Sequence, residues 1–319
     1  MISSLPQSGR LVSKLGPFVR GVLLCCLLVA TALGARTEGN AVRWTMLNVM
    51  GKTDVADCHL LRMPGGATIL VDAGLLGDSP GAVVKALQAQ GVQSIDLAII
   101  SHFHIDHYGA LLDVHDAGIP IRKVVGNVPD KAAADPERPW GCNLDHVHYT
   151  LDGLRNRQIP FHTPAIGERL WSETTAGGAP IAIDAICLYD GLNSPVGRTD
   201  VNDTSIIMKL SVGPTRALFT GDLNNALGTY LAHSEFDLAA DILKVPHHGV
   251  EGAAPDAFFA RVGAQAALVP TPRPLWESDR AGRIRGFFER NQIPAYVSGL
   301  HGHVTVTLTE KGYEIETER

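Results

Sequence analysis

Short apolar runs alternate with helical patterns along the chain from about residue 41 onward. The run at 68–71 (TILV) is rich in β-branched residues and stops at Asp72, so it predicts a strand with Asp72 at its end. Residues 79–91 show an apolar stripe of helical period between a Ser-Pro start and a Gly stop. The next run, 97–100 (LAII), is apolar on both faces, which is typical of a strand covered on both sides in a layered α/β fold.

The same alternation returns in the second half of the chain. Residues 205–210 and 216–219 predict a hairpin that ends in Thr-Gly-Asp222, and 241–245 predicts a strand that ends in Pro-His247-His248-Gly. In each case a predicted strand ends in a potential metal ligand. The C-terminal part predicts a helix over 279–291, a strand at 295–297 and a hairpin with its turn at Lys311-Gly312.

Residues 127–200 have the least regular pattern. Their Pro, Gly and Asp content predicts long loops or an insert over one face. No linker or composition break calls for a second folded unit. We therefore expect one α/β domain over residues 36–319.

The first 35 residues differ from the rest of the chain. Three basic residues precede the uncharged stretch 21–34, and Ala32-Leu33-Gly34 places small residues where a signal peptidase cuts. The stretch is short for a membrane span, which needs ~20 apolar residues. Residues 1–35 therefore predict a signal peptide and an exported protein, periplasmic or extracellular; the alternative is an uncleaved N-terminal anchor.

Composition and charge narrow the function. The chain has 319 residues, 45% of them hydrophobic and 19% charged, as in a globular protein with a full core. A net charge of −6 and the lack of a stretch that mixes basic and aromatic residues give no general attraction to nucleic acid. Signal cleavage would leave three cysteines, too few and too irregular for a disulfide framework. We expect them to be buried, with at most one disulfide bridge among them: Cys58, Cys142 and Cys187.

The stretch SHFHIDHYGA, which follows the predicted strand at 97–100, carries the strongest chemical signal. Alternate residues of an extended segment share a side, so His102 and His104 can approach one ion, while the turn that follows can send Asp106 and His107 toward a second. Imidazole and carboxylate ligands suit zinc, and also manganese or iron. A polar loop is the alternative, but four candidates at this spacing after a buried strand favour a metal site.

Four motifs, HFHIDH, VDAG at 71–74, FTGD at 219–222 and VPHHG at 245–249, together resemble the metallo-β-lactamase superfamily. NDTSIIMKL, ALFTGDL and DILKVPHHG narrow this resemblance to the extracytoplasmic hydrolase domain of ComEC-type DNA-uptake competence proteins, over about residues 43–309. The resemblance implies an αββα sandwich, in which two mixed β-sheets are flanked by helices.

The resemblance also implies a dinuclear site, with zinc as the expected metal. One ion would lie on His102 and His104, the second on Asp106 and His107, and Asp222 would bridge them. Many members of the superfamily have a further histidine on the first site. Residues 200–205 (DVNDTS) hold none here, which leaves that site one ligand short.

A histidine of the His247-His248 pair would complete the second site. Because neighbours on a strand point opposite ways, we expect only one to bind metal, namely His247, with His248 near the substrate. Asp72 and Asn202 are expected beside the ligands, Asp72 as a carboxylate that orients the first histidines.

Together these residues predict a metal-dependent hydrolase. Two ions can activate a water molecule and hold a phosphoryl or carbonyl oxygen, Asp106 could orient the attacking group, and His248 could protonate the leaving oxygen. The resemblance favours a phosphodiester, either a small molecule or a nucleic acid. The alternatives are a carbonyl hydrolase, meaning a β-lactamase or lactonase, and a metal-binding protein without catalysis. No membrane span is expected once the signal is removed.

Overall fold

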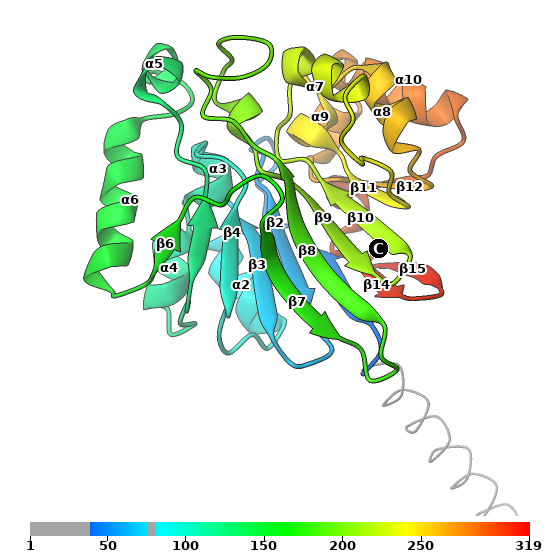
Figure 1. The fold of residues 1–319 in the computed structure, drawn as a ribbon, viewed down its shortest axis with the longest axis horizontal. Coiled ribbons are helices and arrows are strands. Elements are labelled where there is room, and N and C mark those ends of the chain that lie inside the picture. Colours follow the sequence, from blue (N-terminus) through cyan, green and yellow to red (C-terminus); the bar gives the residue numbers. More distant parts are fainter. Residues whose placement is uncertain (1–38, 76–80) are drawn as a thin grey trace, which may run out of the picture. The chain divides into compact units, whose positions relative to one another are not determined.

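Two β-sheets lie face to face in the part of the chain that the structure, a computed structural model, describes, which is residues 39–75 and 81–319 (Figure 1). The strand order is β15-β14-β1-β2-β3-β4-β5-β6 in the first sheet and β13-β12-β11-β10-β9-β8-β7 in the second. The first sheet contains β1 (Val42–Met46), β2 (Cys58–Arg62), β3 (Thr68–Ala73), β4 (Leu97–Ile100), β5 (Val124–Gly126), β6 (Phe161–His162), β14 (Val304–Thr309) and β15 (Gly312–Thr317). The second contains β7 (Arg169–Thr174), β8 (Pro180–Cys187), β9 (Ile207–Val212), β10 (Thr215–Phe219), β11 (Ile242–Lys244), β12 (Ala266–Val269) and β13 (Ala295–Val297).

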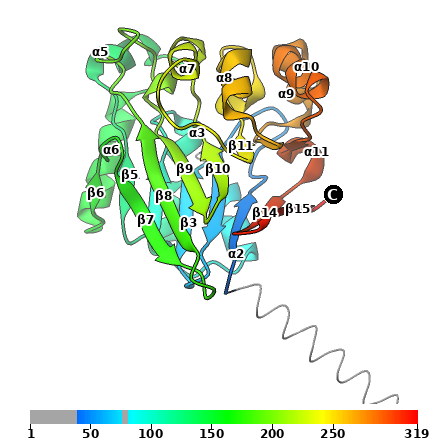
Figure 2. The same cartoon turned by 45° about the vertical axis from the view of Figure 1, so that its right-hand side comes forward.

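Helices cover the outer face of each sheet (Figures 1 and 2). The first half of the chain supplies α2 (Ala82–Ala89), α3 (Ile105–Tyr108), α4 (Leu111–Asp116), α5 (Lys131–Ala134), the 3₁₀ turn η1 (Asp135–Glu137) and α6 (Leu144–Asn156). The second half supplies η2 (Asn202–Thr204), α7 (Asn225–Ala232), η3 (Pro246–Gly249), α8 (Asp256–Val262), α9 (Arg273–Trp276), η4 (Asp279–Ala281), α10 (Gly282–Arg290) and α11 (Ser298–His301).

Three apolar layers hold the elements together. The strands alternate between layers: Ile69 and Val71 of β3 face the core between the sheets, while Leu70 faces the helices α2, α4 and α6. A third layer joins α7, α8 and α10 to the outer face of the second sheet, with Phe258 and Phe259 among its largest fully buried side chains. This arrangement confirms the expected αββα sandwich.

Parallel strands from both sheets end near one another. β3 and β4 run parallel in the first sheet, and β10 and β11 run parallel in the second. Asp72 lies at the end of β3, and Asp222 follows β10. Ligand sites in α/β sheets form outside the carboxyl ends of such strands, so this edge is where the predicted ligands meet.

The region 127–200 is more regular than expected. It contains the 13-residue helix α6 and the hairpin β7-β8, and the pairing of β8 with β9 joins that hairpin to the second sheet. The weak apolar stripe of α6 explains the error, because only Val147, Thr150, Gly153 and Leu154 are buried along it. Most other predicted strands and turns agree with the structure to within about two residues, a usual margin at element ends.

Some sequence-based predictions concern residues outside the described ranges. These are the signal peptide at 1–35 and the Ser79-Pro80 start of α2, which begins within the described residues at Ala82. Within those ranges, Asn40–Arg319 form one compact unit. No helix there is both long and apolar enough to cross a bilayer. Cys58, Cys142 and Cys187 are buried and free, as expected.

Candidate metal centre

The connection after β4 sorts the histidine-rich motif into two groups. His104 has an extended backbone, with φ −86° and ψ 146°, and helix α3 begins at the next residue. His102 and His104 therefore lie on the extended segment, whereas Asp106 and His107 lie on the first turn of the helix. The alternation predicted for the motif ends where α3 begins.

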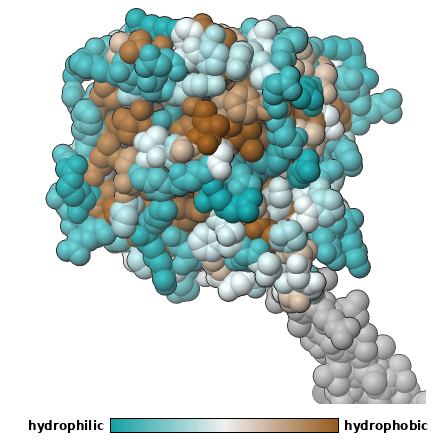
Figure 3. Space-filling model, in the orientation of Figure 1, coloured by the Kyte–Doolittle hydropathy of each residue, from teal (hydrophilic) through white to brown (hydrophobic). Residues whose placement is uncertain are grey.

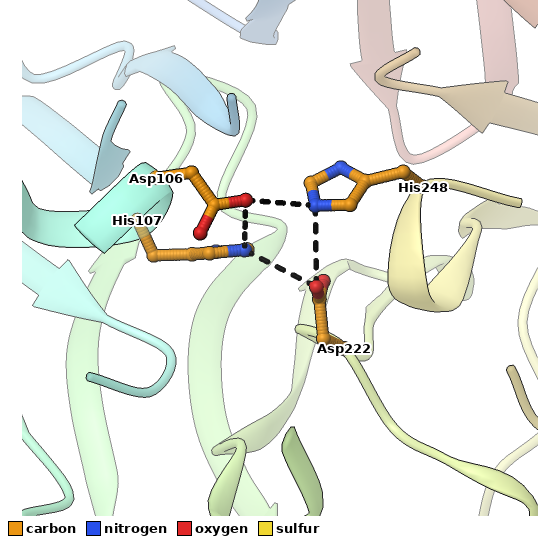
Figure 4. A group of neighbouring side chains, drawn as sticks. All are labelled: Asp106, His107, Asp222 and His248. Atoms are coloured by element: carbon orange, nitrogen blue, oxygen red, sulfur yellow. Dashed lines mark hydrogen bonds and ion pairs between the residues drawn. The ribbon is translucent and has the colours of Figure 1, made fainter. Parts of the chain in front are cut away.

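Four side chains converge on one space at this edge: Asp106, His107, Asp222 and His248 (Figure 4). Nε2 of His248 lies 3.1 Å from Oδ2 of Asp106 and 3.2 Å from Oδ2 of Asp222. Nε2 of His107 lies 3.3 Å from the same oxygen of Asp222 and 3.7 Å from Oδ2 of Asp106. Two imidazole nitrogens and two carboxylate oxygens so arranged form a donor set that suits zinc. We call these four residues the four-donor cluster.

Both imidazoles of the cluster are fixed through their other nitrogen. Nδ1 of His107 lies 2.9 Å from Oδ2 of Asp72, and Nδ1 of His248 lies 3.0 Å from the carbonyl oxygen of Pro270. Such bonds place the proton on Nδ1 and leave Nε2 as the ligand atom, as metal-binding histidines require.

His102 and His104 lie next to the cluster. The His102 ring is 4.1 Å from that of His107 and 4.8 Å from that of His104, between ring centroids. Nε2 of His102 is buried without a hydrogen-bond partner, and its Nδ1 lies 3.1 Å from Oγ of Ser101. Nε2 of His104 contacts Oε2 of Glu137 at 2.6 Å, which leaves its Nδ1 for a metal.

The donors present therefore fit a bound metal. Nε2 of His102 and Nε2 of His107 are both buried and lack a hydrogen-bond partner. Buried polar atoms without a partner are rare and call for an explanation such as an ion. The donors of His102 and His104 do not join those of the four-donor cluster within 4.8 Å, so the first site is less compact than the second.

The histidine pair differs from the prediction, because the structure brings His248, and not His247, into the cluster. The expectation that neighbours on a strand point opposite ways does not apply to this pair. β11 ends at Lys244, and both histidines have left-handed backbones, with φ 49° at His247 and 53° at His248. This turn aims His248 at Asp222, while Nδ1 of His247 is buried without a partner. The proposed role of His248 as a proton donor near the substrate loses its basis, because its Nε2 faces two carboxylates.

Asp72 and Asn202 lie beside the candidate ligands. Asp72 accepts hydrogen bonds from the backbone N–H of Ser101 at 2.7 Å and from the Ser101 hydroxyl at 2.9 Å. It contacts His107 directly and reaches His102 only through Ser101. Asp72 therefore orients His107 more than His102, although the sequence predicts that it orients the first histidines. Asn202 is buried in η2, and its Oδ1 has no hydrogen-bond partner.

Opposite charges dominate the electrostatics of the cluster. Burial raises the pKa of Asp222, but His248, His107 and Lys244 outweigh it and hold that pKa well below its usual range. Burial lowers the pKa of His107 and His248, and the carboxylate of Asp222 then raises both well above the usual value. Burial and the two neighbouring histidines lower the pKa of His102, which keeps its ring neutral, as a ligand must be.

Sequence reasoning missed three buried charged residues beside the centre: Asp57, Glu137 and Lys244. Lys244 does carry a signal, because a lysine in the short apolar run DILKV stands out once that run is buried. Glu137 and Asp57 carry none. Their neighbours in the chain are ordinary, and the residues that bury them come from distant segments, such as Val201, whose N–H donates to Glu137 at 2.9 Å.

Residues 51–186 match the family model described as the metallo-beta-lactamase superfamily. This range includes Asp72 and the motif from His102 to His107 but ends before Asp222 and His248. ComE operon protein 3 of Bacillus subtilis (strain 168) is 23% identical over 193 residues, which are 59% of this chain and 21% of that protein. The chain thus spans about a fifth of the length of this curated relative.

Among solved structures, the metallo-beta-lactamase fold protein YhfI from Bacillus subtilis superposes with a TM-score of 0.52 at 14% identity. The alignment covers 84% of this chain and 100% of that one. At this identity the likeness shows the fold alone. The family match and the shared fold confirm the resemblance to the metallo-β-lactamase superfamily, and the ComE operon match agrees with its narrower form.

Proposed function

We propose that this chain, which carries a metallo-β-lactamase superfamily domain, is an exported metal-dependent hydrolase that cleaves a phosphodiester. The observation that carries the proposal is the four-donor cluster. Its two imidazoles and two carboxylates face one space at the edge where the parallel strands of both sheets end. The resemblance to the ComEC-type hydrolase domain supports a phosphodiester over a carbonyl substrate.

Zinc is the metal that we propose, with manganese or iron as alternatives, in two sites. Asp106, His107 and His248 would hold the second ion, His102 and His104 the first, and Asp222 would serve both. When bound, such ions supply a nucleophile at neutral pH and neutralise developing charge on the phosphoryl oxygens. The chain's own part is to fix the donors: Asp72 keeps the proton on Nδ1 of His107, and Pro270 does the same for His248.

An exposed aromatic side chain near the centre, Trp140, favours a substrate with an aromatic group. On the face seen in Figure 3, apolar patches are separated by hydrophilic residues. The exposed large hydrophobic side chains of the described residues all lie between 140 and 196: Trp140, Tyr149, Ile166, Leu192 and Val196. Trp140 is 70% exposed, and its ring centroid is 6.3 Å from that of His104. A ring in this place could stack on a nucleobase of a diester held at the metals.

The export half of the proposal depends on residues 1–35, whose basic flank, apolar stretch and small-residue end follow the signal-peptide pattern. Expression of the full chain in a bacterium, followed by cell fractionation and mass spectrometry of the N-terminus, tests it. A periplasmic or secreted protein that begins near residue 36 supports the proposal. An intact N-terminus on protein that stays in the cytoplasm contradicts it.

Hydrolysis of bis(p-nitrophenyl) phosphate by the purified chain, freed of metal and reloaded with zinc or manganese, tests the activity. Metal-dependent turnover is expected in the wild type and should be lost in Asp222→Ala. Asp152→Ala is a matched control, because Asp152 is exposed on α6 and its side chain pairs with Arg155. Turnover of β-lactams or lactones without turnover of the diester would replace the phosphodiester by a carbonyl substrate.

A further inference from the structure

The ammonium group of Lys244 is buried in contact with Asp222, the candidate bridging ligand. Lys244 is the last residue of β11 and is only 1% exposed. Its Nζ donates to the carbonyl oxygen of Gly221 at 2.8 Å and to Oδ1 of Asp222 at 3.4 Å, and it pairs with Oδ2 of Asp57. A lysine is rarely buried without such partners, so these three acceptors are what stabilises the buried ammonium group.

Asp57 is the counter-ion that keeps this ammonium in place. It is fully buried just before β2, where its carboxylate faces Lys244 and both imidazoles of the cluster. Its Oδ1 lies 3.3 Å from Nδ1 of His248, and its Oδ2 lies 3.8 Å from Nδ1 of His107. Asp57, Asp72 and His107 could by themselves form a second group of metal donors, but the ammonium of Lys244 already pairs with Asp57 there.

The two oxygens of Asp222 therefore have different partners. Oδ1 faces Lys244, whereas Oδ2 faces Nε2 of His107 and Nε2 of His248. The N–H of Asp222 also donates to Oγ of Ser205 at 2.9 Å, which fixes the backbone at this point. A carboxylate held on one side by a fixed cation presents its other oxygen to the opposite side.

We propose that Lys244 is a positioning residue, which holds Oδ1 of Asp222 and so directs Oδ2 toward the metals, with Asp57 as its fixed counter-ion. The ammonium group of Lys244 is in contact with both carboxylates and with the carbonyl oxygen of Gly221. The inference rests on the metal-binding part of the proposed function and does not require that the substrate be a phosphodiester.

Titration of the metal-free chain with Mn²⁺, followed by electron paramagnetic resonance and calorimetry, tests this role. Lys244→Met should weaken Mn²⁺ binding about 10- to 100-fold, the range typical when a partner of a metal ligand is removed. Lys209→Met is the matched control. Lys209 is also a buried lysine paired with an aspartate, but its ammonium group contacts Asp237 and not a residue of the four-donor cluster.

Lys244→Met alone leaves the buried charge of Asp57 without its ammonium counter-ion, which destabilises a protein. The double variant Lys244→Met/Asp57→Asn removes both charges, and denaturant unfolding checks that it is folded. Weak Mn²⁺ binding in this folded double variant supports the positioning role. If Lys244 only stabilised the fold, removal of both charges should restore Mn²⁺ binding. Binding at wild-type affinity in either Lys244 variant overturns the inference.

The outcomes separate the inference from the proposed function. A wild type that binds Mn²⁺ but hydrolyses no diester overturns the proposed activity alone. A wild type that hydrolyses the diester, together with a Lys244→Met variant that binds Mn²⁺ equally well, overturns the positioning role alone. A wild type that binds neither Mn²⁺ nor Zn²⁺ overturns both.

Discussion

His248 and His247 are neighbours in the chain, yet they occupy different surroundings. Nε2 of His248 faces the carboxylates of Asp106 and Asp222, and its Nδ1 is fixed by Pro270. Nδ1 of His247 lies buried without a partner, with its backbone turned in the same left-handed sense. The pair thus offers a direct comparison between a proposed ligand and an adjacent residue of the same type.

We predict that His248→Ala weakens zinc binding by more than the about 10- to 100-fold that follows loss of an outer partner, because a ligand atom itself is removed. His247→Ala should cause a smaller loss. Competition with a chromophoric zinc chelator measures both affinities. The assignment is wrong if His247→Ala is the more damaging substitution.

Trp140 gives a second prediction at this scale. A base stacked on an aromatic ring contributes about 1–3 kcal/mol, so Trp140→Ala should raise KM for a dithymidine phosphodiester roughly 5- to 150-fold with little change in kcat. Glycerophosphocholine, a diester without an aromatic ring, should show no such change. Tyr149→Ala is the control, since Tyr149 is 73% exposed on α6 and has no ring contact with a candidate ligand among the described residues. Equal effects on both substrates would rule out stacking.

At the scale of elements, η2 connects helix α7 to the site. Asp203 lies in η2, is 2% exposed, and accepts hydrogen bonds from the backbone N–H of Asn224 at 2.7 Å and of Leu227 at 3.4 Å. It thus caps the N-terminal end of α7, where an acceptor is favoured. Burial and the neighbouring Asp200 nevertheless raise its pKa from 3.8 to about 7.

This raised pKa predicts a pH dependence of stability. Between pH 4 and 7 the folded state holds a proton on Asp203 that the unfolded state has lost, so the contribution of Asp203 to stability falls as pH rises through this window. The rise from 3.8 to about 7 amounts to roughly 4 kcal/mol at most. Asp203→Asn keeps an acceptor for α7 and should therefore gain stability relative to the wild type between pH 5 and pH 8.

Urea unfolding at the two pH values measures this gain. Asp256→Asn is the matched control, because Asp256 lies in the first turn of α8 but its side chain is 43% exposed. A wild type and an Asp203→Asn variant with parallel pH profiles would contradict the raised pKa.

The parts of the fold that the sequence predicts well are those in which local pattern and tertiary packing agree. β3 and β4 are short and apolar on both faces because one face meets the other sheet and the opposite face meets helices. α6 was missed because its buried stripe is narrow and interrupted by polar residues. The extended segment and turn around His102 to His107 follow from local spacing, but the choice between His247 and His248 depends on a left-handed turn that the strand rule does not describe.

At the scale of the whole molecule, the centre draws on both halves of the chain. Asp106 and His107 come from the first half, and Asp222 and His248 from the second. A metal bound here would therefore favour the folded state over the unfolded chain, in which these donors are far apart.

We predict that removal of metal by a chelator lowers the thermal midpoint. With free zinc at about 100 times its Kd, binding stabilises the folded state by about 2.7 kcal/mol, which corresponds to roughly 5 °C for a domain of this size. Differential scanning calorimetry of the metal-free and zinc-loaded protein measures the shift. The same shift in Asp222→Ala would show that zinc binds elsewhere.

The division of the donors between the two halves also bears on how gene fragments are chosen. A fragment that ends at residue 186, where the family match ends, would keep the whole HxHxDH motif and Asp72. It would lack Asp222, His248, Lys244 and every strand of the second sheet except β7 and most of β8. A search that accepts the motif as sufficient would thus count as intact a polypeptide with half of its cluster missing. Truncation libraries for this protein should accordingly keep β9 to β14 together with the motif.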